Sequence, residues 1–314
     1  MNNAAIAASG LRKAYGDKTI LDGIDLEVEA GTIFSLLGPN GAGKTTTVNL
    51  LTTLLNADGG TARVAGHDVA TEQRAVRASI GVTGQFAAVD DLLTGVENLQ
   101  LMADLHHLRG AERKRVVTGL LERFELTASA GSLASTYSGG MRRKLDLAMT
   151  LVTKPQIVFL DEPTTGLDPR SRRTMWEIVR ELTSDGVTIF LTTQYLEEAD
   201  QLADRIAVLD QGRIVAEGTS AELKRRLPGS HILLRFTDST DLEAAQRILA
   251  GSTRDDEALT LQVPGSGGSK FLRGLLDRLA EHSIEADEVS IHTPDLDDVF
   301  LALTGHATTE AEAQ

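Results

Sequence analysis

The sequence predicts an α/β protein with a sheet of buried, mainly parallel strands. Two short apolar runs, residues 33–37 and 157–160, have the continuous hydrophobic character of strands that are covered on both faces. The first run leads into a glycine-rich loop, and residues 46–55 then show helical spacing without Gly or Pro. The second run ends in Asp161-Glu162, at the carboxyl end where open α/β sheets bind ligands. We therefore expect a site at this edge of the sheet.

The glycine-rich loop fits the phosphate-binding pattern G-x-x-x-x-G-K-[ST]. It consists of Gly38, Pro39, Asn40, Gly41, Ala42, Gly43, Lys44, Thr45 and Thr46. Glycines let the backbone turn tightly, so that its N–H groups and the N-terminus of the next helix can surround phosphate oxygens. Lys44 is then expected to reach the β- and γ-phosphates, and the Thr45 hydroxyl to bind Mg²⁺. The alternative is a strand-to-helix turn that meets the pattern by chance.

The two acidic residues after the second apolar run indicate hydrolysis of a nucleoside triphosphate. Asp161 is suited to hold Mg²⁺, directly or through water. Glu162 is suited to polarise the water that attacks the γ-phosphate, while the loop and the metal stabilise the developing charge. The pair could instead cap the next helix, but the phosphate-binding loop upstream favours catalysis.

Three further motifs are weak alone and gain meaning beside the first two. Tyr15 precedes a turn, where an aromatic ring could stack on a nucleotide base or simply pack. Gln85 follows a short apolar strand, and its amide could meet a metal or a water, or lie in a surface loop. The tripeptide Ser138-Gly139-Gly140 precedes a helix, where it could bind an anion or serve only as a cap with a loop.

In this order, the motifs resemble an ATP-binding-cassette (ABC) ATPase over residues 6–227. The resemblance implies a P-loop nucleotide-binding domain with a mixed sheet and an inserted helical subdomain, using ATP and Mg²⁺. It also implies that Tyr15 stacks on adenine. Gln85 would contact Mg²⁺ and relay to a membrane subunit.

The same resemblance implies a dimer. Ser138-Gly139-Gly140 would be the signature motif, and Asp168 would belong to a loop that crosses the dimer interface. Two ATP molecules would lie between two copies of the chain, each phosphate-binding loop facing the signature of the other copy. Closure of such a dimer would expel water from the reaction.

Several positions depart from the commonest family pattern. Tyr137 and Met141 flank the signature glycines where Leu and Gln are usual, and Gly166 stands where many members have Ser or Ala. Gln194 occupies the place of a histidine that contacts the γ-phosphate. A Gln amide can donate a hydrogen bond, but it cannot carry a charge or shuttle a proton. We therefore predict that Gln194 binds phosphate as a donor and that Glu162 carries the water activation.

Gln194, the Met-containing signature and the C-terminal tail together resemble one branch of the family, the daunorubicin/doxorubicin-resistance exporter ATPases. That resemblance implies a homodimer of ATPase subunits and a separate integral-membrane permease subunit. The partner would carry a hydrophobic, drug-like cargo such as an antibiotic. The ATPase itself would be a peripheral protein at the cytoplasmic face of the cell membrane.

Composition agrees with this interpretation. The 314 residues suffice for a nucleotide-binding domain and a small second domain, and the chain has no cysteine. Neither a signal peptide nor a membrane-spanning run is expected. The net charge is −14, with 16 acidic against 6 basic residues from Ser230 onward. An acidic chain without a basic stripe is a poor candidate for binding nucleic acid.

We expect a nucleotide-binding domain at 1–228, with its helical subdomain at about 86–152, and a small α+β domain at 229–305. Residues 306–314 are expected to be a disordered tail. Near the end, residues 296–300 resemble a motif of the exporter branch, where the tail domain is implied to hold the dimer together. The alternative is an ordinary amphipathic helix with its apolar face buried.

Two classes of function remain open. One is the ATPase subunit of an export pump, and the other is a soluble ABC ATPase that acts on ribosomes or DNA. Members of the second class usually carry two nucleotide domains or a long coiled coil, and neither is indicated here. Within export, the cargo could also be a lipid, a polysaccharide precursor or an ion.

Overall fold

The computed structural model describes residues 4–85, 87–226, 231–265, 268–292 and 295–305. By its internal contacts the chain divides into two compact units, Met1–Ser220 and Ala221–Gln314. The predicted boundary after residue 228 and the predicted tail at 306–314 both lie outside the described residues. None of the helices in the described ranges combines the length and the apolar character that a membrane span requires.

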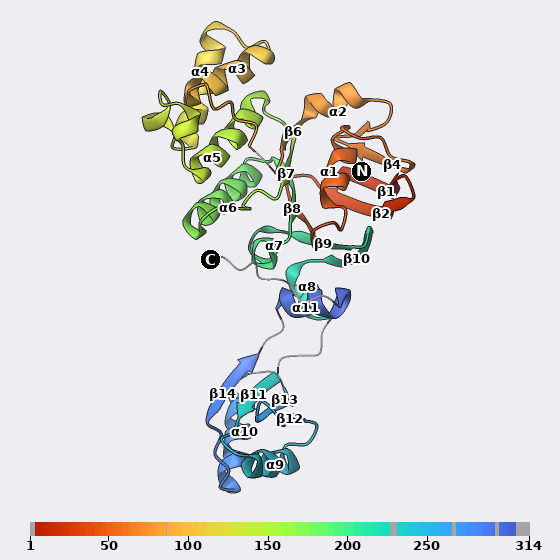
Figure 1. Cartoon of the computed structure of the whole chain (residues 1–314), viewed down its shortest axis with the longest axis vertical. Coiled ribbons are helices and arrows are strands. Elements are labelled where there is room, and N and C mark those ends of the chain that lie inside the picture. The colour runs from red at the N-terminus through yellow and green to blue at the C-terminus, as the bar shows by residue number, and fades with distance from the viewer. Residues whose placement is uncertain (1–3, 86, 227–230, 266–267, 293–294, 306–314) are drawn as a thin grey trace. The chain divides into compact units, whose positions relative to one another are not determined.

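The first unit is built around a six-stranded sheet in the order β10-β9-β3-β8-β7-β6 (Figure 1). Its strands are β3 (Ile33–Leu37), β6 (Ile80–Thr83), β7 (Ile157–Asp161), β8 (Thr188–Thr193), β9 (Arg205–Asp210) and β10 (Arg213–Gly218). All neighbours are parallel except β9 and β10. Ile157 and Phe159 of β7 enter one core cluster, whereas Val158 and Leu160 enter the other. This sheet is therefore covered on both faces, as its apolar runs predict.

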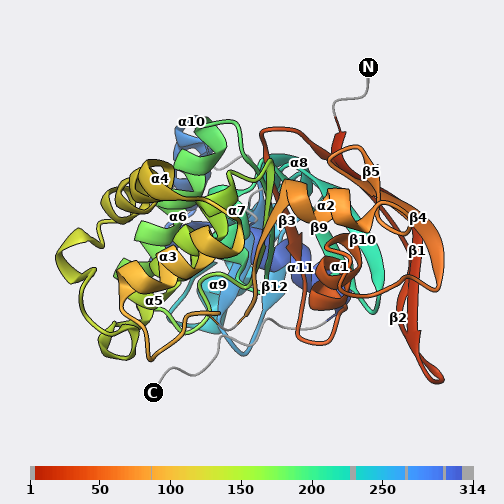
Figure 2. The ribbon, with the colours of Figure 1, turned by 90° about the horizontal axis from the view of Figure 1, so that it is seen from above.

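A second, antiparallel sheet in the order β2-β1-β4-β5 packs on the face of the central sheet that carries Ile157 and Phe159 (Figure 2). It comprises β1 (Ala4–Tyr15), β2 (Lys18–Glu29), β4 (Gly59–Val64) and β5 (His67–Asp68). One core cluster joins this sheet to the central sheet and to the helices α1 (Lys44–Leu51) and α2 (Gln73–Ser79). Phe190 lies at its centre, with its ring centroid 5.6 Å from that of Phe34 and 5.4 Å from that of Phe159.

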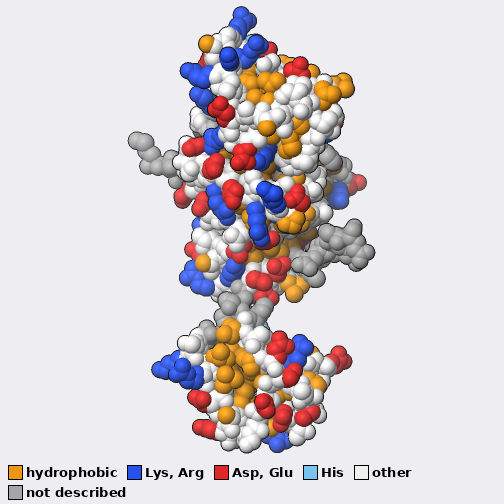
Figure 3. Space-filling view, turned by 90° about the vertical axis from the view of Figure 1, so that its left-hand side faces the viewer, with side chains coloured by type: hydrophobic (Ala, Val, Ile, Leu, Met, Phe, Trp, Pro, Cys, Tyr) orange, Lys and Arg blue, Asp and Glu red, His pale blue; other side chains and the backbone are white. Residues whose placement is uncertain are grey.

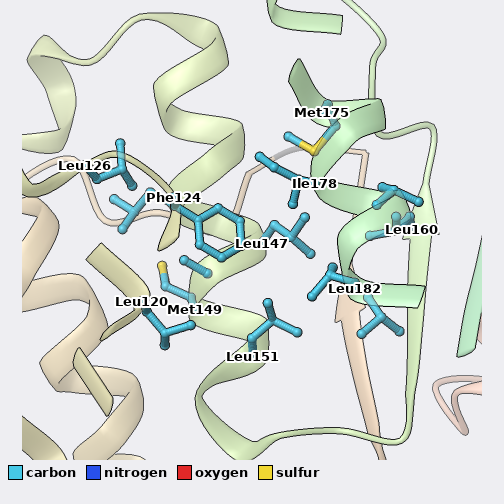
Figure 4. Packing of buried hydrophobic residues seen from close by; sticks show 14 of the residues in the cluster. Leu120, Phe124, Leu126, Leu147, Met149, Leu151, Leu160, Met175, Ile178 and Leu182 are labelled. Atoms are coloured by element: carbon cyan, nitrogen blue, oxygen red, sulfur yellow. The ribbon is translucent and has the colours of Figure 1, made fainter. Parts of the chain in front are cut away.

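Helices cover the other face of the central sheet. They are α3 (Gly95–Leu105), α4 (Gly110–Arg123), α5 (Gly139–Thr150), α6 (Pro169–Ser184) and α7 (Leu196–Leu202), with the short 3₁₀ helices η1 (Thr127–Ser129), η2 (Ala134–Thr136) and η3 (Leu151–Thr153). Figure 4 shows their shared core, in which Phe124 and Leu147 pack beside Met175 and Ile178. This core fixes α5 and α6 against β7, and each of these elements carries part of the predicted site.

The second unit contains a four-stranded antiparallel sheet in the order β12-β13-β11-β14. Its elements are α8 (Ser220–Lys224, which begins at the last residue of the first unit), β11 (His231–Arg235), α9 (Ser239–Ile248), β12 (Thr253–Asp255), β13 (Thr260–Pro264), α10 (Ser269–Glu281), β14 (Glu288–His292) and α11 (Leu296–Thr304). In α11, Leu296, Val299 and Phe300 are buried on one face, in agreement with the amphipathic pattern.

Candidate functional site

The glycine-rich loop joins β3 to α1 and turns where no larger residue fits. A Cβ atom at Gly38 would lie 2.3 Å from the carbonyl oxygen of Leu209. Gly43 has φ of 112°, and a Cβ there would lie 2.5 Å from Leu21 Cδ2. These contacts make glycine obligatory at both positions. The loop therefore runs directly over the end of the sheet, with the N-terminus of α1 behind it.

Lys44 is buried at the start of α1. Its Nζ donates to the carbonyl oxygens of Gly38 at 2.8 Å and Pro39 at 3.2 Å, and lies 3.1 Å from Glu162 Oε1. Both charged side chains are more than nine-tenths buried. A buried ammonium needs oxygen partners, and phosphate oxygens can serve in the same way. The loop therefore holds a cation ready for an anionic ligand.

Asp161 ends β7 beside the same loop. Its Oδ2 accepts a hydrogen bond from Thr45 Oγ1 at 2.9 Å, and its Oδ1 accepts one from Thr192 Oγ1 at 2.5 Å. Thr192 is held opposite Asp161 by the parallel register of β7 and β8. The hydroxyl and carboxylate oxygens of Thr45 and Asp161 are ligands of the kind that Mg²⁺ prefers. One carboxylate and one hydroxyl fit Mg²⁺ that is also bound by substrate phosphates, because Mg²⁺ is usually held by one or two carboxylates together with such phosphates.

Glu162 follows in an uncommon backbone conformation. Its φ is +49°, in the left-handed region that non-glycine residues rarely adopt. Its N–H donates to both the carbonyl oxygen and the hydroxyl of Thr192 at 3.1 Å. Its Oε2 accepts from Thr165 Oγ1 at 3.3 Å and lies 3.5 Å from Gln85 Nε2, just beyond the end of β6. The structure thus brings Lys44, Gln85 and Glu162 together.

Gln194 lies at the same edge of the sheet. It directly follows Thr193, the last residue of β8, which pairs in register with Leu37, the residue before the glycine-rich loop. Its side chain is half-buried. The sheet register therefore places Gln194 at the end of β8, between the two strands that carry the loop and the acidic pair.

The motif Ser138-Gly139-Gly140 starts α5. Ser138 caps the helix, with its Oγ accepting from Met141 N at 3.3 Å, and both Ser138 and Gly139 are exposed. A Cβ atom at Gly140 would lie 2.5 Å from Ser171 Oγ, so α5 and α6 approach closely here. The motif is therefore presented to solvent at a helix N-terminus.

Asp168 caps the neighbouring helix α6. Its Oδ1 accepts from the N–H groups of Arg170 and Ser171, both at 3.0 Å, and Ser171 Oγ donates to its Oδ2 at 2.5 Å. The hydrogen bond from the Ser171 side chain, together with those from the backbone, lowers the pKa of Asp168. Because Gly140 packs on Ser171, the exposed Asp168 and the Ser138 motif lie beside each other.

Comparison with known proteins decides the family. A family profile described as "ABC transporter" matches residues 21–165. Daunorubicin resistance ATP-binding protein DrrA3 of Streptomyces coeruleorubidus is 50% identical over 316 residues, covering 100% of both chains. The daunorubicin/doxorubicin resistance ATP-binding protein DrrA of Streptomyces peucetius is 47% identical, over 99% of this chain and 95% of that protein. The chain belongs to the ABC transporter family.

The fold agrees with this assignment. A dimeric ATP-binding cassette with ADP and Pi, solved in a post-hydrolysis state, superposes with a TM-score of 0.61 at 26% identity, covering 68% of this chain and 98% of that one. The predicted α/β cassette fold and the predicted ABC ATPase of the daunorubicin/doxorubicin-resistance type are both confirmed. As an ABC ATPase, the protein binds and hydrolyses ATP.

In this ABC ATPase, Tyr15 lies at the end of the β1–β2 hairpin of the antiparallel sheet, where it pairs with Lys18. It is the last residue of β1, its side chain is 52% exposed, and Lys13 Nζ lies 5.7 Å from the ring centroid. Lys13 pairs with Leu21, the residue that contacts the loop at Gly43. The exposed ring can therefore stack at the side of the phosphate-binding loop.

Sequence reasoning missed a buried ion pair on α5. Arg143 Nη1 lies 3.2 Å from Asp146 Oδ2, and both side chains are more than nine-tenths buried. Burial raises the pKa of Asp146, because it penalises the ionised carboxylate. The signal in the sequence was a carboxylate, Asp146, inside the otherwise apolar run of residues 145–149.

A second buried acid, Glu198 on α7, was also missed. Its Oε1 accepts from Thr164 Oγ1 at 2.8 Å and from Trp176 Nε1 at 3.1 Å. Burial raises the pKa of Glu198 above its ordinary value of 4.5. Glu198 is buried because α7 turns this side chain inward onto α6.

Proposed function

We propose that the protein is the ATP-hydrolysing subunit of an exporter. ATP binding would close two copies of the chain, and hydrolysis would reopen them, driving access changes in a separate integral-membrane permease subunit. The observation that carries this proposal is the buried Lys44–Glu162 pair at 3.1 Å, set beside the contact between Thr45 and Asp161. These contacts support the proposal, because at one sheet edge Lys44 would bind phosphate, Thr45 and Asp161 would hold the metal, and Glu162 would activate water.

Binding of the triphosphate would rearrange this pair. The γ-phosphate oxygens would take over the ammonium of Lys44, which releases Glu162 to accept a hydrogen bond from the attacking water. Thr45 and Asp161 would hold Mg²⁺, which would supply charge stabilisation on the phosphates when bound. Gln85, whose amide already reaches Glu162, would complete this shell. Gln194 would donate a hydrogen bond to the γ-phosphate.

The active species is proposed to be a homodimer. In one chain the hydrogen bond that Ser138 accepts comes from its own helix, and Ser138 and Gly139 are exposed at the start of α5. A second copy could place that helix N-terminus over the γ-phosphate of the first. Asp168, exposed beside Ser138, would then lie at the interface between the copies.

The C-terminal unit is proposed to support this dimer and its pairing with the permease. Its helix α11 is well specified, because Asp295 and Asp298 form a capping box and Leu296, Val299 and Phe300 are buried. Among its described residues the buried side chains are almost all apolar. That composition supports a role in assembly rather than in chemistry.

We propose a peripheral position at the cytoplasmic face of the cell membrane and a hydrophobic, drug-like cargo that the permease carries. The support for this cargo is the resistance named in two relatives that align along nearly the whole chain. Nucleic acid is not a proposed partner, because Lys/Arg and Asp/Glu side chains are interspersed on the face drawn in Figure 3 and the net charge is −14.

Purification with its membrane partner tests the proposal. The chain should co-purify with one integral-membrane protein, and in vesicles that partner should stimulate ATP hydrolysis further when doxorubicin is added. Stimulation by a lipid, a polysaccharide precursor or an ion instead would reassign the cargo and keep the exporter. ATP-dependent binding to ribosomes without any membrane association would overturn the proposal.

A further inference from the structure

The guanidinium of Arg143 connects the two segments that carry Gln85 and Glu162. It is buried on α5, and its Nη1 donates to the carbonyl oxygen of Gly84 at 2.7 Å. Its Nε donates to the carbonyl oxygen of Pro163 at 2.9 Å, and its Nη2 to that of Asp161 at 3.3 Å. One side chain therefore holds the residue before Gln85 and both neighbours of Glu162.

Asp146 fixes this guanidinium from the next turn of α5. Its Oδ2 lies 3.2 Å from Arg143 Nη1, and its Oδ1 accepts from the N–H of Ala88 at 3.0 Å. The segment after β6 is thus tied to α5 at Gly84 and again at Ala88. A planar fork with five donors suits this task, because it can reach several carbonyl groups at fixed angles.

Glu162 needs such support. A non-glycine residue at φ of +49° is strained, and such a conformation persists only where the surroundings determine it from several sides. Thr192 holds the N–H of Glu162, and Arg143 holds the carbonyl groups of Asp161 and Pro163 on either side. The direction of the Glu162 carboxylate therefore depends on a residue that does not touch it.

We propose that Arg143, held by Asp146, is a positioning residue for hydrolysis: it keeps Glu162 in its working conformation and links it to Gly84, the residue before Gln85. A displacement of Gly84, which directly follows β6, would then be transmitted through the guanidinium to Glu162. This inference rests on the proposed catalytic role of Glu162. Arg143 would act through Glu162, because its hydrogen bonds go to main-chain carbonyl groups and to Asp146.

The decisive variant replaces both charges at once, Arg143→Met with Asp146→Asn. Removing one member alone would leave a buried unpaired charge and endanger folding, whereas removing both avoids that cost. The amide introduced by Asp146→Asn keeps an oxygen acceptor for the N–H of Ala88. We expect the double variant to fold with a lowered thermal midpoint, because three carbonyl groups lose their donor. KM for ATP should change by less than about twofold and kcat should fall about 10- to 100-fold, because small misplacements cost rates of this order.

Two single variants complete the set. Arg143→Lys keeps the charge but loses the fork, so its kcat should also fall while KM for ATP stays unchanged. Arg142→Met is the matched control, because Arg142 is the preceding residue of the same helix and its half-exposed side chain pairs with Asp91 at 2.7 Å. It should retain the kcat of the natural protein.

Natural kcat in the double variant would overturn the inference, and so would equal losses in kcat and ATP affinity, which indicate general damage to the site. Glu162→Gln in the same assay distinguishes a failure of the proposed catalytic role of Glu162 from a failure of the positioning role of Arg143. If Glu162→Gln hydrolyses ATP normally, the proposed role of Glu162 fails. If Glu162→Gln is inactive while the double variant and Arg143→Lys are fully active, the role of Arg143 fails alone.

Discussion

The two units of the chain differ in whether they bury charged side chains. The first unit buries Lys44, Arg143, Asp161, Glu162 and, on α5 and α7, two further carboxylates. In the described part of the second unit, the buried polar side chain is a threonine and the charged groups lie at the surface. Burying charge costs free energy unless partners are present, so a protein retains it where chemistry requires it.

This difference in buried charge indicates which unit is expected to carry out the chemistry. In the first unit each buried charge lies at or next to the carboxyl ends of the central strands. In the second unit a small apolar core, with Ile232, Leu234 and Leu261 fully buried, is sufficient for folding. Substitutions of Lys44, Glu162 and the residues that hold them should therefore change turnover, whereas substitutions in the core of the second unit should change stability or assembly.

The largest effect on turnover is expected for Glu162→Gln. Loss of the general base should lower kcat by about 10²- to 10⁴-fold while ATP binding is retained. Steady-state phosphate release and equilibrium binding of a fluorescent ATP analogue measure the two quantities. Glu177→Gln, on the exposed face of α6, is the matched control and should behave as the natural protein. Near-normal turnover in Glu162→Gln would contradict the role of this buried carboxylate as the general base.

A smaller loss is expected for Gln194→Ala. One hydrogen bond to a charged phosphate is worth about 1.5–3 kcal/mol, so kcat/KM should fall about 10- to 100-fold. A Gln amide does not titrate. The pH profiles of kcat/KM for the natural protein and for Gln194→Ala should therefore show the same ionisations. Gln100→Ala on α3 serves as control. Unchanged kcat/KM in Gln194→Ala would show that this amide does not bind phosphate.

Glu198→Gln should alter the pH dependence of stability more than turnover. Burial raises the pKa of Glu198 in the folded state, so the folded protein binds a proton that the unfolded chain has already released. Stability from this group therefore falls as pH rises from the unfolded pKa, near 4.5, to the raised folded pKa. Glu198→Gln removes that fall.

Denaturant unfolding of the natural protein and of Glu198→Gln across this pH range checks the sign. The variant should gain stability relative to the natural protein as pH increases, since its amide has no ionisation cost and keeps an oxygen for Thr164 and Trp176. A stability difference that does not change with pH would contradict the raised pKa of Glu198.

The smallest effect on turnover is expected in the second unit. Leu234→Ala empties a fully buried position and should lower the stability of that unit by about 2–5 kcal/mol. Hydrolysis by the isolated ATPase should stay within about twofold of the natural rate, because this core holds no catalytic group. Leu276→Ala, at a position 41% exposed on α10, is the control. A large loss of kcat in Leu234→Ala without unfolding would contradict the expectation that the second unit does not contribute to hydrolysis.

The sequence was sufficient for the parts of the site that a local pattern encodes. Phosphate binding needs a particular backbone path, which the glycines at 38 and 43 specify, and Asp161-Glu162 stand at the end of an unmistakable buried strand. The antiparallel pairing of β1 with β2 and β4 and the short strand β12 were beyond a local pattern.

Arg143 and Glu198 could not be assigned for a related reason. Arg143 acts on Gly84 and Pro163, which are distant in the sequence, and Glu198 acts on Trp176 of another helix. Their environments exist only after the sheet and its covering helices have packed. A charged residue in an apolar helical stretch shows that a partner is needed, but it does not show which one.

A mixing experiment tests the shared site between two copies most directly. Lys44→Ala removes the cation of the loop, and Ser138→Arg blocks the signature, so each variant alone should hydrolyse almost no ATP. A mixed dimer contains one site with both parts intact, and a 1:1 mixture should therefore regain up to about a quarter of the natural rate. Two folded variants that stay inactive when mixed, or Ser138→Arg that is active alone, would contradict a site built from two copies.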